Sequence, residues 1–479
     1  MGRQYWQGLT NLYSRVGKRA LAIICVIAGL LLTGGVLAGV GRGAFAGVIG
    51  LGMLIILIVL RCDALLLVVL IGLHLYLDWY QGLHILVPLL SFLLLPLFYL
   101  LRSASHPWTW PRCPWLWMLF LLLTIYPAVK GGMLMVYDAA SFYPSDILGA
   151  LLMYWLGMVV VYDKASLQRF FQLFTFMSVI LAAHTLFQSV TGTILLASER
   201  VDTFLSRTDV AYYQMASTDT RRIGSFFIDP NWNGAFFALA FFLPLGLFVA
   251  SSSVWQKLSY LLALVLILLA LLCTYSTGAW IALLMGLIVF LVFIGSVASR
   301  ILFLLVGCGL AVLVFFLFPE QIALQMQHAS ANNELSLRIA AWQTALLVTQ
   351  AYPWFGVGLG HQAYLIRSNM YRVPEQFVVL SHPHNSYLEW AAMAGIPVLC
   401  IFLVLIGIAL QQSCLNWRRA EPAVKPLIGA GIASTITLSI NSFSINGWTH
   451  FALALIIWPI LGAVASPLLR TPDGEAKNG

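Results

Sequence analysis

Two histidines separated by one proline are the strongest candidates for proton chemistry in this sequence. His382, Pro383 and His384 are followed by Asn385, and a long apolar run begins directly after them. Imidazole is the side chain most ready to exchange a proton near neutral pH, and proline stiffens the backbone between the two rings. The pattern therefore predicts that His384 or His382 acts as a general base where a polar loop meets the membrane. Zinc is a weaker alternative, because no third ligand falls in an obvious register with the pair.

A second group of polar residues stands before another apolar run and can bind an anion. Arg221 and Arg222 are followed by Asp229 and Asn231, which flank Pro230 at the predicted start of a helix near residue 232. Asp229 or Asn231 can cap that helix, because its first amides need side-chain acceptors and proline fits its first turn. The same helix start, with its positive dipole, can also help to hold a phosphate group. The sequence leaves both interpretations open.

A third pattern predicts an amphipathic helix that carries one arginine. Apolar residues recur with helical spacing from residue 335 to residue 347, and the pattern stops at Tyr352 and Pro353. Arg338 and Trp342 lie four residues apart, so they share one face of this helix. We expect the helix to lie at the outer membrane surface, with the guanidinium at the level of the lipid headgroups. Arg338 is then either an anion-binding side chain or a snorkelling anchor.

The glycine-rich stretch 356–360 looks only superficially like a dinucleotide-binding fingerprint. No strand is predicted before it, and no βαβ unit can form around it. We therefore expect a turn in which the backbone closely approaches another segment.

Composition defines the class of protein that must position these residues. Of the 479 residues, 61% are apolar and 9% are charged, whereas an ordinary soluble domain is about 25% charged. The mean hydropathy is +0.92, and a water-soluble enzyme is excluded. A membrane helix needs roughly 20 mostly apolar residues. Runs such as 258–273 meet this requirement and lack the alternation of a membrane barrel strand.

The apolar windows predict an all-α polytopic membrane protein with about 12 to 14 transmembrane helices. We expect residues 1–479 to form a single integral membrane domain with two long outer segments, 191–230 and 319–385. The second segment contains the amphipathic surface helix and ends at the histidine pair, and connectors of such length usually have a function. The predicted spans are 20–40, 44–60, 64–80, 83–101, 114–129, 147–161, 170–190, 232–250, 258–275, 277–297, 301–318, 386–411, 427–445 and 450–467.

The basic residues indicate the orientation of these spans. The chain has 25 Lys and Arg against 17 Asp and Glu, a formal net charge of +8. If both termini are cytoplasmic, most basic residues of the short loops fall on the cytoplasmic side, as the positive-inside rule requires. The excess charge is then a topology signal that also attracts anionic membrane lipids, and no nucleic-acid partner is expected. The two long segments lie on the opposite side.

Together these motifs resemble the bacterial O-antigen ligase and O-antigen polymerase superfamily. The resemblance rests on the ordered series 222–231, 338–342, 352–358 and 384–395, and it covers about residues 220–400. One departure concerns residues 275–278, which read Tyr-Ser-Thr-Gly where family members often carry Ser-Arg. Any role of a basic residue at that place is therefore lost here.

The resemblance implies a glycosyltransferase of the bacterial inner membrane that needs no metal or other cofactor and whose active site faces the periplasm. Its donor would be a glycan linked to undecaprenyl pyrophosphate. By position in the family motif, Arg222 and Arg338, with Arg221 beside them, would hold the pyrophosphate. His384 would deprotonate the acceptor hydroxyl, with His382 as the other candidate, and direct attack on an α-linked donor would invert the anomeric centre. The supporting residues would be Asn385, Asp229, Asn231 and Trp342.

Two acceptors fit this chemistry, and a third function belongs to another class. A ligase would transfer the glycan to a lipid A core sugar, which the His-Pro-His-Asn form favours. A polymerase would transfer it to another carrier-linked repeat unit, which the Asp-Pro-Asn triplet and the extra spans favour. A transporter or lipid flippase ranks lower, because such proteins usually bury ionisable groups near the bilayer midplane. Here most ionisable residues stand at span ends, with His184 among the exceptions.

Overall fold

The computed structural model describes residues 63–78, 109–136, 142–191, 212–214, 221–227, 229–293, 334–376 and 379–469, with isolated positions between 91 and 323. The spans expected at 20–40, 44–60, 83–101 and 301–318 lie wholly or largely outside these residues. So does most of the polar segment 191–230.

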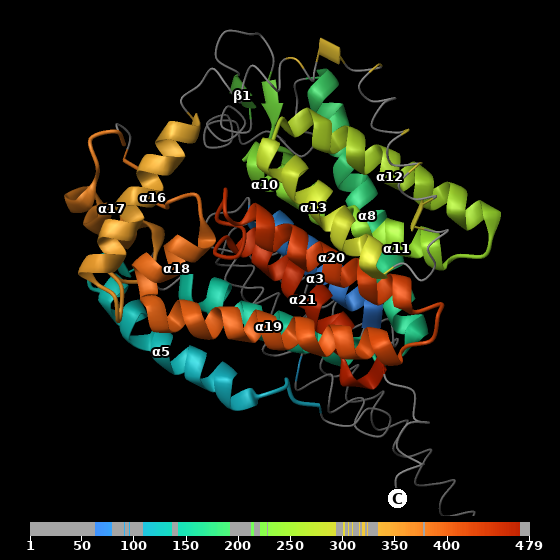
Figure 1. Cartoon of the computed structure of the whole chain (residues 1–479), viewed down its shortest axis with the longest axis horizontal. Coiled ribbons are helices and arrows are strands. Elements are labelled where there is room, and N and C mark those ends of the chain that lie inside the picture. The colour runs from blue at the N-terminus through green and yellow to red at the C-terminus, as the bar shows by residue number, and fades with distance from the viewer. Residues whose placement is uncertain are drawn as a thin grey trace, which may run out of the picture.

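The described part of the chain is built of helices, as the apolar runs predict (Figure 1). Within it, six helical segments are long and apolar enough to cross a membrane. A π-helical turn, Tyr143–Leu148, precedes α7. The helices are α3 (Asp63–Asp78), α5 (Pro114–Gly132), α7 (Gly149–Val160), α8 (Lys164–Thr191), α10 (Pro230–Ala240), α11 (Phe242–Ala250), α12 (Val254–Thr274), α13 (Thr277–Phe293), α16 (Glu334–Ala351), α17 (His361–Ser368), α18 (Ser386–Ala394), α19 (Ile396–Arg419), α20 (Lys425–Asn441) and α21 (Phe451–Ala465).

One short antiparallel strand pair stands beside the helices. β1 (Tyr212–Gln214) pairs with β2 (Arg221–Ile223), and Tyr213 lies opposite Arg222. The sequence pattern did not predict strands here. The pair matters because β2 leads almost directly into α10 and so fixes where Arg222 lies.

The span predicted at 386–411 is wrong as a single helix, because Gly395 divides it into α18 and α19. Gly395 has a φ of +94°, a backbone conformation that residues with a Cβ rarely adopt. A Cβ at this position would also meet the backbone of Trp354 and Phe355. The residues after the histidine pair therefore form a short helix of their own before the long α19 begins.

The turn at 356–360 brings backbones together, as expected. The Val357 amide donates to the Ala392 carbonyl in α18 at 2.8 Å, and the Leu359 amide donates to the Pro127 carbonyl in α5 at 2.9 Å. A Cβ at Gly358 would overlap the backbone of Gly131. The turn therefore ties α18 to the last turn of α5.

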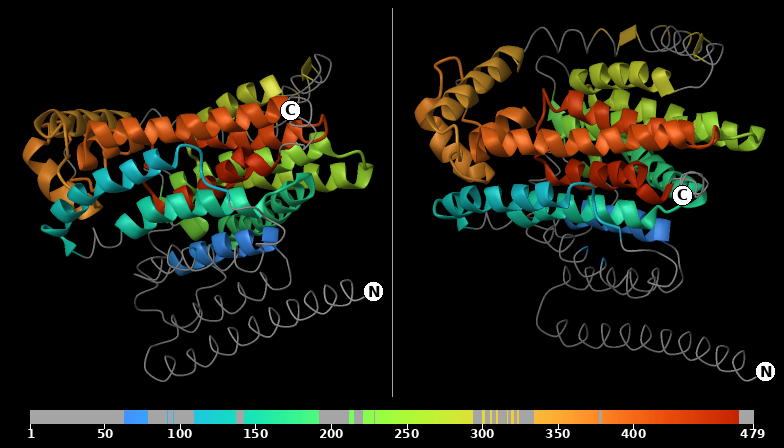
Figure 2. Two further views of the ribbon diagram at one scale, coloured as in Figure 1. Left: turned by 90° about the horizontal axis from the view of Figure 1, so that it is seen from below. Right: turned by 60° about the horizontal axis from the view of Figure 1, so that its bottom comes forward.

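Several helix ends that carry polar residues meet at one end of the helical bundle. Trp232, in the first turn of α10, donates from its indole nitrogen to Asn446, which lies between α20 and α21. Gly278, near the start of α13, lies against Ser444 in the same connection. Figures 1 and 2 show α16, α17 and α18 together at the end of the molecule where α19 begins.

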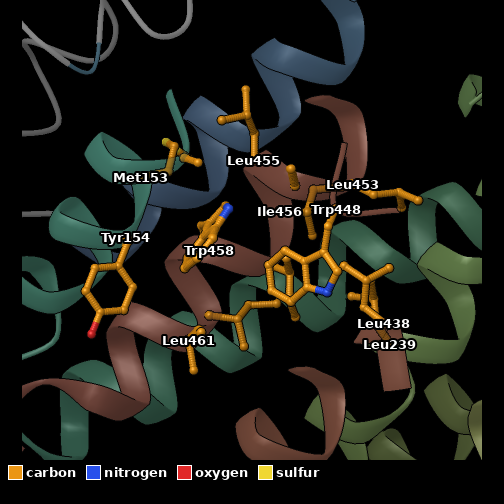
Figure 3. Close-up of a cluster of buried hydrophobic side chains, with 14 of the residues drawn as sticks. Met153, Tyr154, Leu239, Leu438, Trp448, Leu453, Leu455, Ile456, Trp458 and Leu461 are labelled. Carbon is orange, nitrogen blue, oxygen red and sulfur yellow. The ribbon is translucent and has the colours of Figure 1, made fainter. Parts of the chain in front are cut away.

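A core of aromatic and aliphatic side chains from α7, α10, α20, α21 and the connection before α21 packs inside the bundle (Figure 3). The rings of Trp448 and Trp458 are 5.1 Å apart at 58°, and Tyr154 meets Trp458 edge to face. Edge-to-face aromatic pairs stabilise a core beyond the area they bury. This packing gives a rigid base to the residues just before α21.

Close packing of α7 against α21 depends on glycine, and this gives a stability prediction. A Cβ at Gly462 would overlap the Tyr154 backbone, whereas a Cβ at Gly407 in α19 would meet nothing within 4 Å. Overpacking costs about 1–3 kcal/mol. We expect Gly462→Ala to unfold at a lower temperature than the parent in detergent, and Gly407→Ala not to do so. Equal melting temperatures for the two variants would contradict this packing.

Candidate active site

Arg222 is held at the junction of β2, α10 and α12. Its Nε donates to the Thr274 carbonyl at 3.0 Å, and its Nη2 donates to Asn231 Oδ1 at 2.7 Å. The residue is 6% exposed. These two contacts orient the guanidinium beside the start of α10. Arg222 is therefore a fixed positive charge next to a helix start.

The start of α10 lies directly beside this guanidinium. Asp229 is the N-cap, and its Oδ1 accepts from the Asn231 amide at 2.6 Å. Asn231 Oδ1 also accepts from the Ser276 hydroxyl at 3.3 Å, which ties α10 to the start of α13. Asp229 thus has the capping role that the sequence allowed. The positive end of the helix dipole adds to the charge of Arg222.

The histidine pair forms a compact turn before α18. His384 has a φ of +52°, and its amide donates to Nδ1 of His382 at 3.3 Å. The two ring centroids are 4.3 Å apart. Asn385 caps α18, because its Oδ1 accepts from the amides of Tyr387 and Leu388. The turn therefore fixes both imidazoles relative to a helix start.

The environment of His382 keeps its imidazole neutral. Burial lowers the pKa of His382 well below its ordinary value, and the neighbouring imidazoles of His384, His361 and His450 lower it further. Since Nδ1 of His382 accepts the His384 amide, a neutral His382 carries its proton on Nε2. His382 is then a hydrogen-bond donor at Nε2.

A buried carboxylate lies on the other side of the histidine pair. Glu389 is 0% exposed, and its Oε1 is 2.9 Å from Nε2 of His361 at the start of α17. Its Oε2 accepts from the Thr449 hydroxyl at 2.6 Å. The ring centroids of His361 and His382 are 5.7 Å apart. Glu389 thus connects α17, α18 and the residues before α21.

One aromatic contact joins the arginine region to the histidine region. Trp232 follows Asn231 in α10, and its indole stacks on His450 with the ring centroids 3.5 Å apart. A positive charge on His450 would lower the pKa of His382. Thr449, the residue before His450, donates to Glu389 Oε2 in α18, the helix that follows the histidine pair. These residues therefore form one connected set that links the start of α10, beside Arg222, to α18.

The remaining predicted site residues lie on elements at the edge of this set. Arg338 and Trp342 lie on α16, which packs against α18, and both are partly buried. Convergence of Arg338 with Arg222 on one donor stays a prediction. Arg221 belongs to β2, but its side chain lies outside what the structure describes.

The helix predicted around Arg338 is confirmed, and its apolar stripe faces outward. Leu335 is 62% exposed and Leu346 is 47% exposed, whereas Ala341 and Ala345 are buried against the protein. An outward apolar stripe is what a helix in contact with lipid presents. Its position at a membrane surface stays a prediction.

Sequence reasoning missed the partners of the histidine pair. It gave no catalytic or positioning role to His361, Glu389, Thr449 or His450. One local signal was present, because Glu389 is the sole charged residue of the otherwise apolar helix 386–394. A carboxylate in such a helix must find a partner when it is buried. Among the residues that the structure describes, no three His, Cys, Asp or Glu side chains are grouped to hold a metal ion.

Comparison with known proteins agrees with the resemblance seen in the motifs. Residues 262–403 match the family model described as O-antigen ligase. The matched region runs from within α12 to within α19, and it contains Arg338, the histidine pair and Glu389 but not Arg222. No curated protein matches the chain.

The helices and this match together define a multi-pass membrane protein with an O-antigen ligase-type region. The resemblance to that superfamily is thereby confirmed over residues 262–403.

Proposed function

We propose that this protein is a glycosyltransferase of the O-antigen ligase type. It moves a glycan from undecaprenyl pyrophosphate, at the periplasmic face of the inner membrane, onto a hydroxyl group of the lipid A core. The observation that supports this most is the stacking of Trp232 on His450, because it links the helix start beside Arg222 to the residues that bond to α18, the helix after the histidine pair.

The arginine region has the chemistry needed for the leaving group. When the glycosidic bond breaks, its electron pair goes to the pyrophosphate oxygen, which gains negative charge. A fixed guanidinium in a partly dry site stabilises such developing charge, and Arg222 is oriented by Thr274 and Asn231. The amides at the start of α10 add their partial positive charge. Arg338 would contribute a second guanidinium from α16.

The histidine region has the chemistry needed for the acceptor. The acceptor oxygen attacks the anomeric carbon, and its proton passes to the imidazole of His384. His384 is assigned this role because Nδ1 of His382 already accepts the His384 amide. His382 then supports the turn and offers its Nε2 hydrogen as a donor. A single displacement of this kind inverts the anomeric centre.

Reconstitution tests the proposal and separates its two forms. The purified protein is placed in liposomes with carrier-linked glycan and is given either lipid A core or a second carrier-linked repeat unit. We expect transfer to lipid A core with release of undecaprenyl pyrophosphate. Longer carrier-linked chains formed in the absence of lipid A would identify a polymerase instead. If carrier-linked glycan crosses the bilayer and no new glycosidic bond forms, the protein is a transporter and neither a ligase nor a polymerase.

A further inference from the structure

Glu389 lies where an uncompensated negative charge is costly. It is fully buried in α18, and its two carboxylate oxygens contact His361 and Thr449. Thr449 contributes only a neutral hydroxyl, so it cannot balance the charge. A buried carboxylate needs a cationic partner with good hydrogen-bond geometry. His361 Nε2, at 2.9 Å from Oε1, has that geometry.

His361 is in turn close to the histidine pair. It is 27% exposed, so its ring reaches the site while its nitrogen contacts the buried carboxylate. Phe142 packs edge-on against it, and the His382 ring lies 5.7 Å away on another side. A positive charge on His361 therefore acts on the proton affinity of the neighbouring imidazoles.

We infer that Glu389 is a positioning residue of the proposed transferase: it holds His361 as a cation beside His382 and so keeps the histidine pair neutral and ready to accept a proton. The inference rests on the proposed function, in which His384 is the base. The titratable groups that are seen to interact within the described part of this cluster include His361, His382, His384, His450, Glu389 and Tyr364.

The donor itself explains why such a cation is useful. A pyrophosphate bound near Arg222 brings negative charge toward the histidine pair, and negative charge raises the pKa of an imidazole. A base that this effect has already protonated cannot take the proton from the hydroxyl group of the acceptor substrate. The cation on His361 opposes the effect, and Glu389 is needed to keep that cation charged near neutral pH.

The pH dependence of kcat/KM for transfer tests the inference. Without the carboxylate, His361 is largely neutral above its ordinary pKa, so the nearby positive charge disappears and the pKa of the base rises. We expect the acid limb of the profile to move to higher pH in Glu389→Gln, by about one pH unit. Glu389→Asp, which keeps the charge, should restore part of the original profile.

His361→Gln provides an independent variant at a partly exposed position. It removes the same cation, so its acid limb should move in the same direction. The double variant should match Glu389→Gln, because neither variant carries a charge at either position, whereas His361→Gln leaves the carboxylate uncompensated and should move at least as far. Glu421→Gln, a matched charge removal at an exposed position just after α19, should leave the profile unchanged.

Each result bears on a separate claim. If Glu389→Gln and His361→Gln lose activity without any shift of the acid limb, Glu389 is a structural residue and the inference is overturned. If the parent makes no glycosidic bond, or His384→Ala keeps full activity, the proposed function fails. If folded Glu389→Gln has the same pH profile of kcat/KM as the parent, the inference is also overturned, but the proposed transferase function stands.

Discussion

His384→Ala is expected to abolish glycan transfer while the protein still binds its lipid-linked donor. The substitution removes the proposed proton acceptor, and general base catalysis typically contributes a factor of roughly 10²–10⁴. Donor binding should persist, because the charge that binds pyrophosphate lies at Arg222 and the start of α10. The measurements are the initial rate of transfer in liposomes and the affinity for carrier-linked glycan.

His382→Ala is the matched control for this prediction. His382 accepts the His384 amide and has its proton on Nε2, so its loss disturbs the turn without removing the base. We expect a smaller fall in rate than in His384→Ala. An inactive His382→Ala together with an active His384→Ala would reverse the two assignments.

Arg222→Ala should lower kcat and raise KM for the donor together. The guanidinium would contact the pyrophosphate both before and during bond breaking. Its removal therefore weakens donor binding and also slows the chemical step. Removal of one charged contact in a partly dry site costs roughly 2 to 4 kcal/mol, a fall in kcat/KM of about thirty-fold to several hundred-fold. Arg222→Lys should recover only part of it, because an ammonium cannot bond simultaneously to Thr274 and Asn231 in the same fork geometry.

Substitutions of two other arginines are the comparisons for this prediction. Arg419→Ala removes an exposed positive charge at the far end of α19 and should keep parental kinetics. Arg338→Ala should resemble Arg222→Ala if both guanidinium groups contact one donor. Wild-type kinetics in Arg338→Ala would show that this residue is a surface anchor, whereas wild-type kinetics in Arg222→Ala would remove the basis of the pyrophosphate site.

The long helices could be predicted from the sequence because hydropathy depends on each segment alone. The apolar windows 114–129 and 258–275 correspond to α5 (Pro114–Gly132) and α12 (Val254–Thr274). The break at Gly395 could not be placed in the same way. Glycine occurs within many apolar helices, and its φ of +94° here is set by the close approach of the Trp354 backbone. That approach is a tertiary contact without a local pattern.

In the candidate site, too, residues in local motifs could be predicted, whereas residues joined only by tertiary contacts could not. His384 and Arg222 were found because each stands in a short polar motif next to an apolar run. The pair of His361 and Glu389 spans 28 residues, and Glu389 contacts Thr449 across 60 residues. No sequence period connects such positions, and only the packing of α17, α18 and α21 brings them together. The sequence therefore indicated the reacting groups but not the groups that set their charge.

The contacts of Trp232 with His450 and of Glu389 with Thr449 have a consequence for biogenesis. Both are completed by residues that immediately precede α21, the last long helix described. A nascent polypeptide that has inserted only its earlier helices lacks these partners, even though its arginine and its histidine pair have already been synthesised. For the transferase proposed above, incomplete translation products would therefore be catalytically silent, and carrier lipid would be consumed only after insertion into the bilayer is finished.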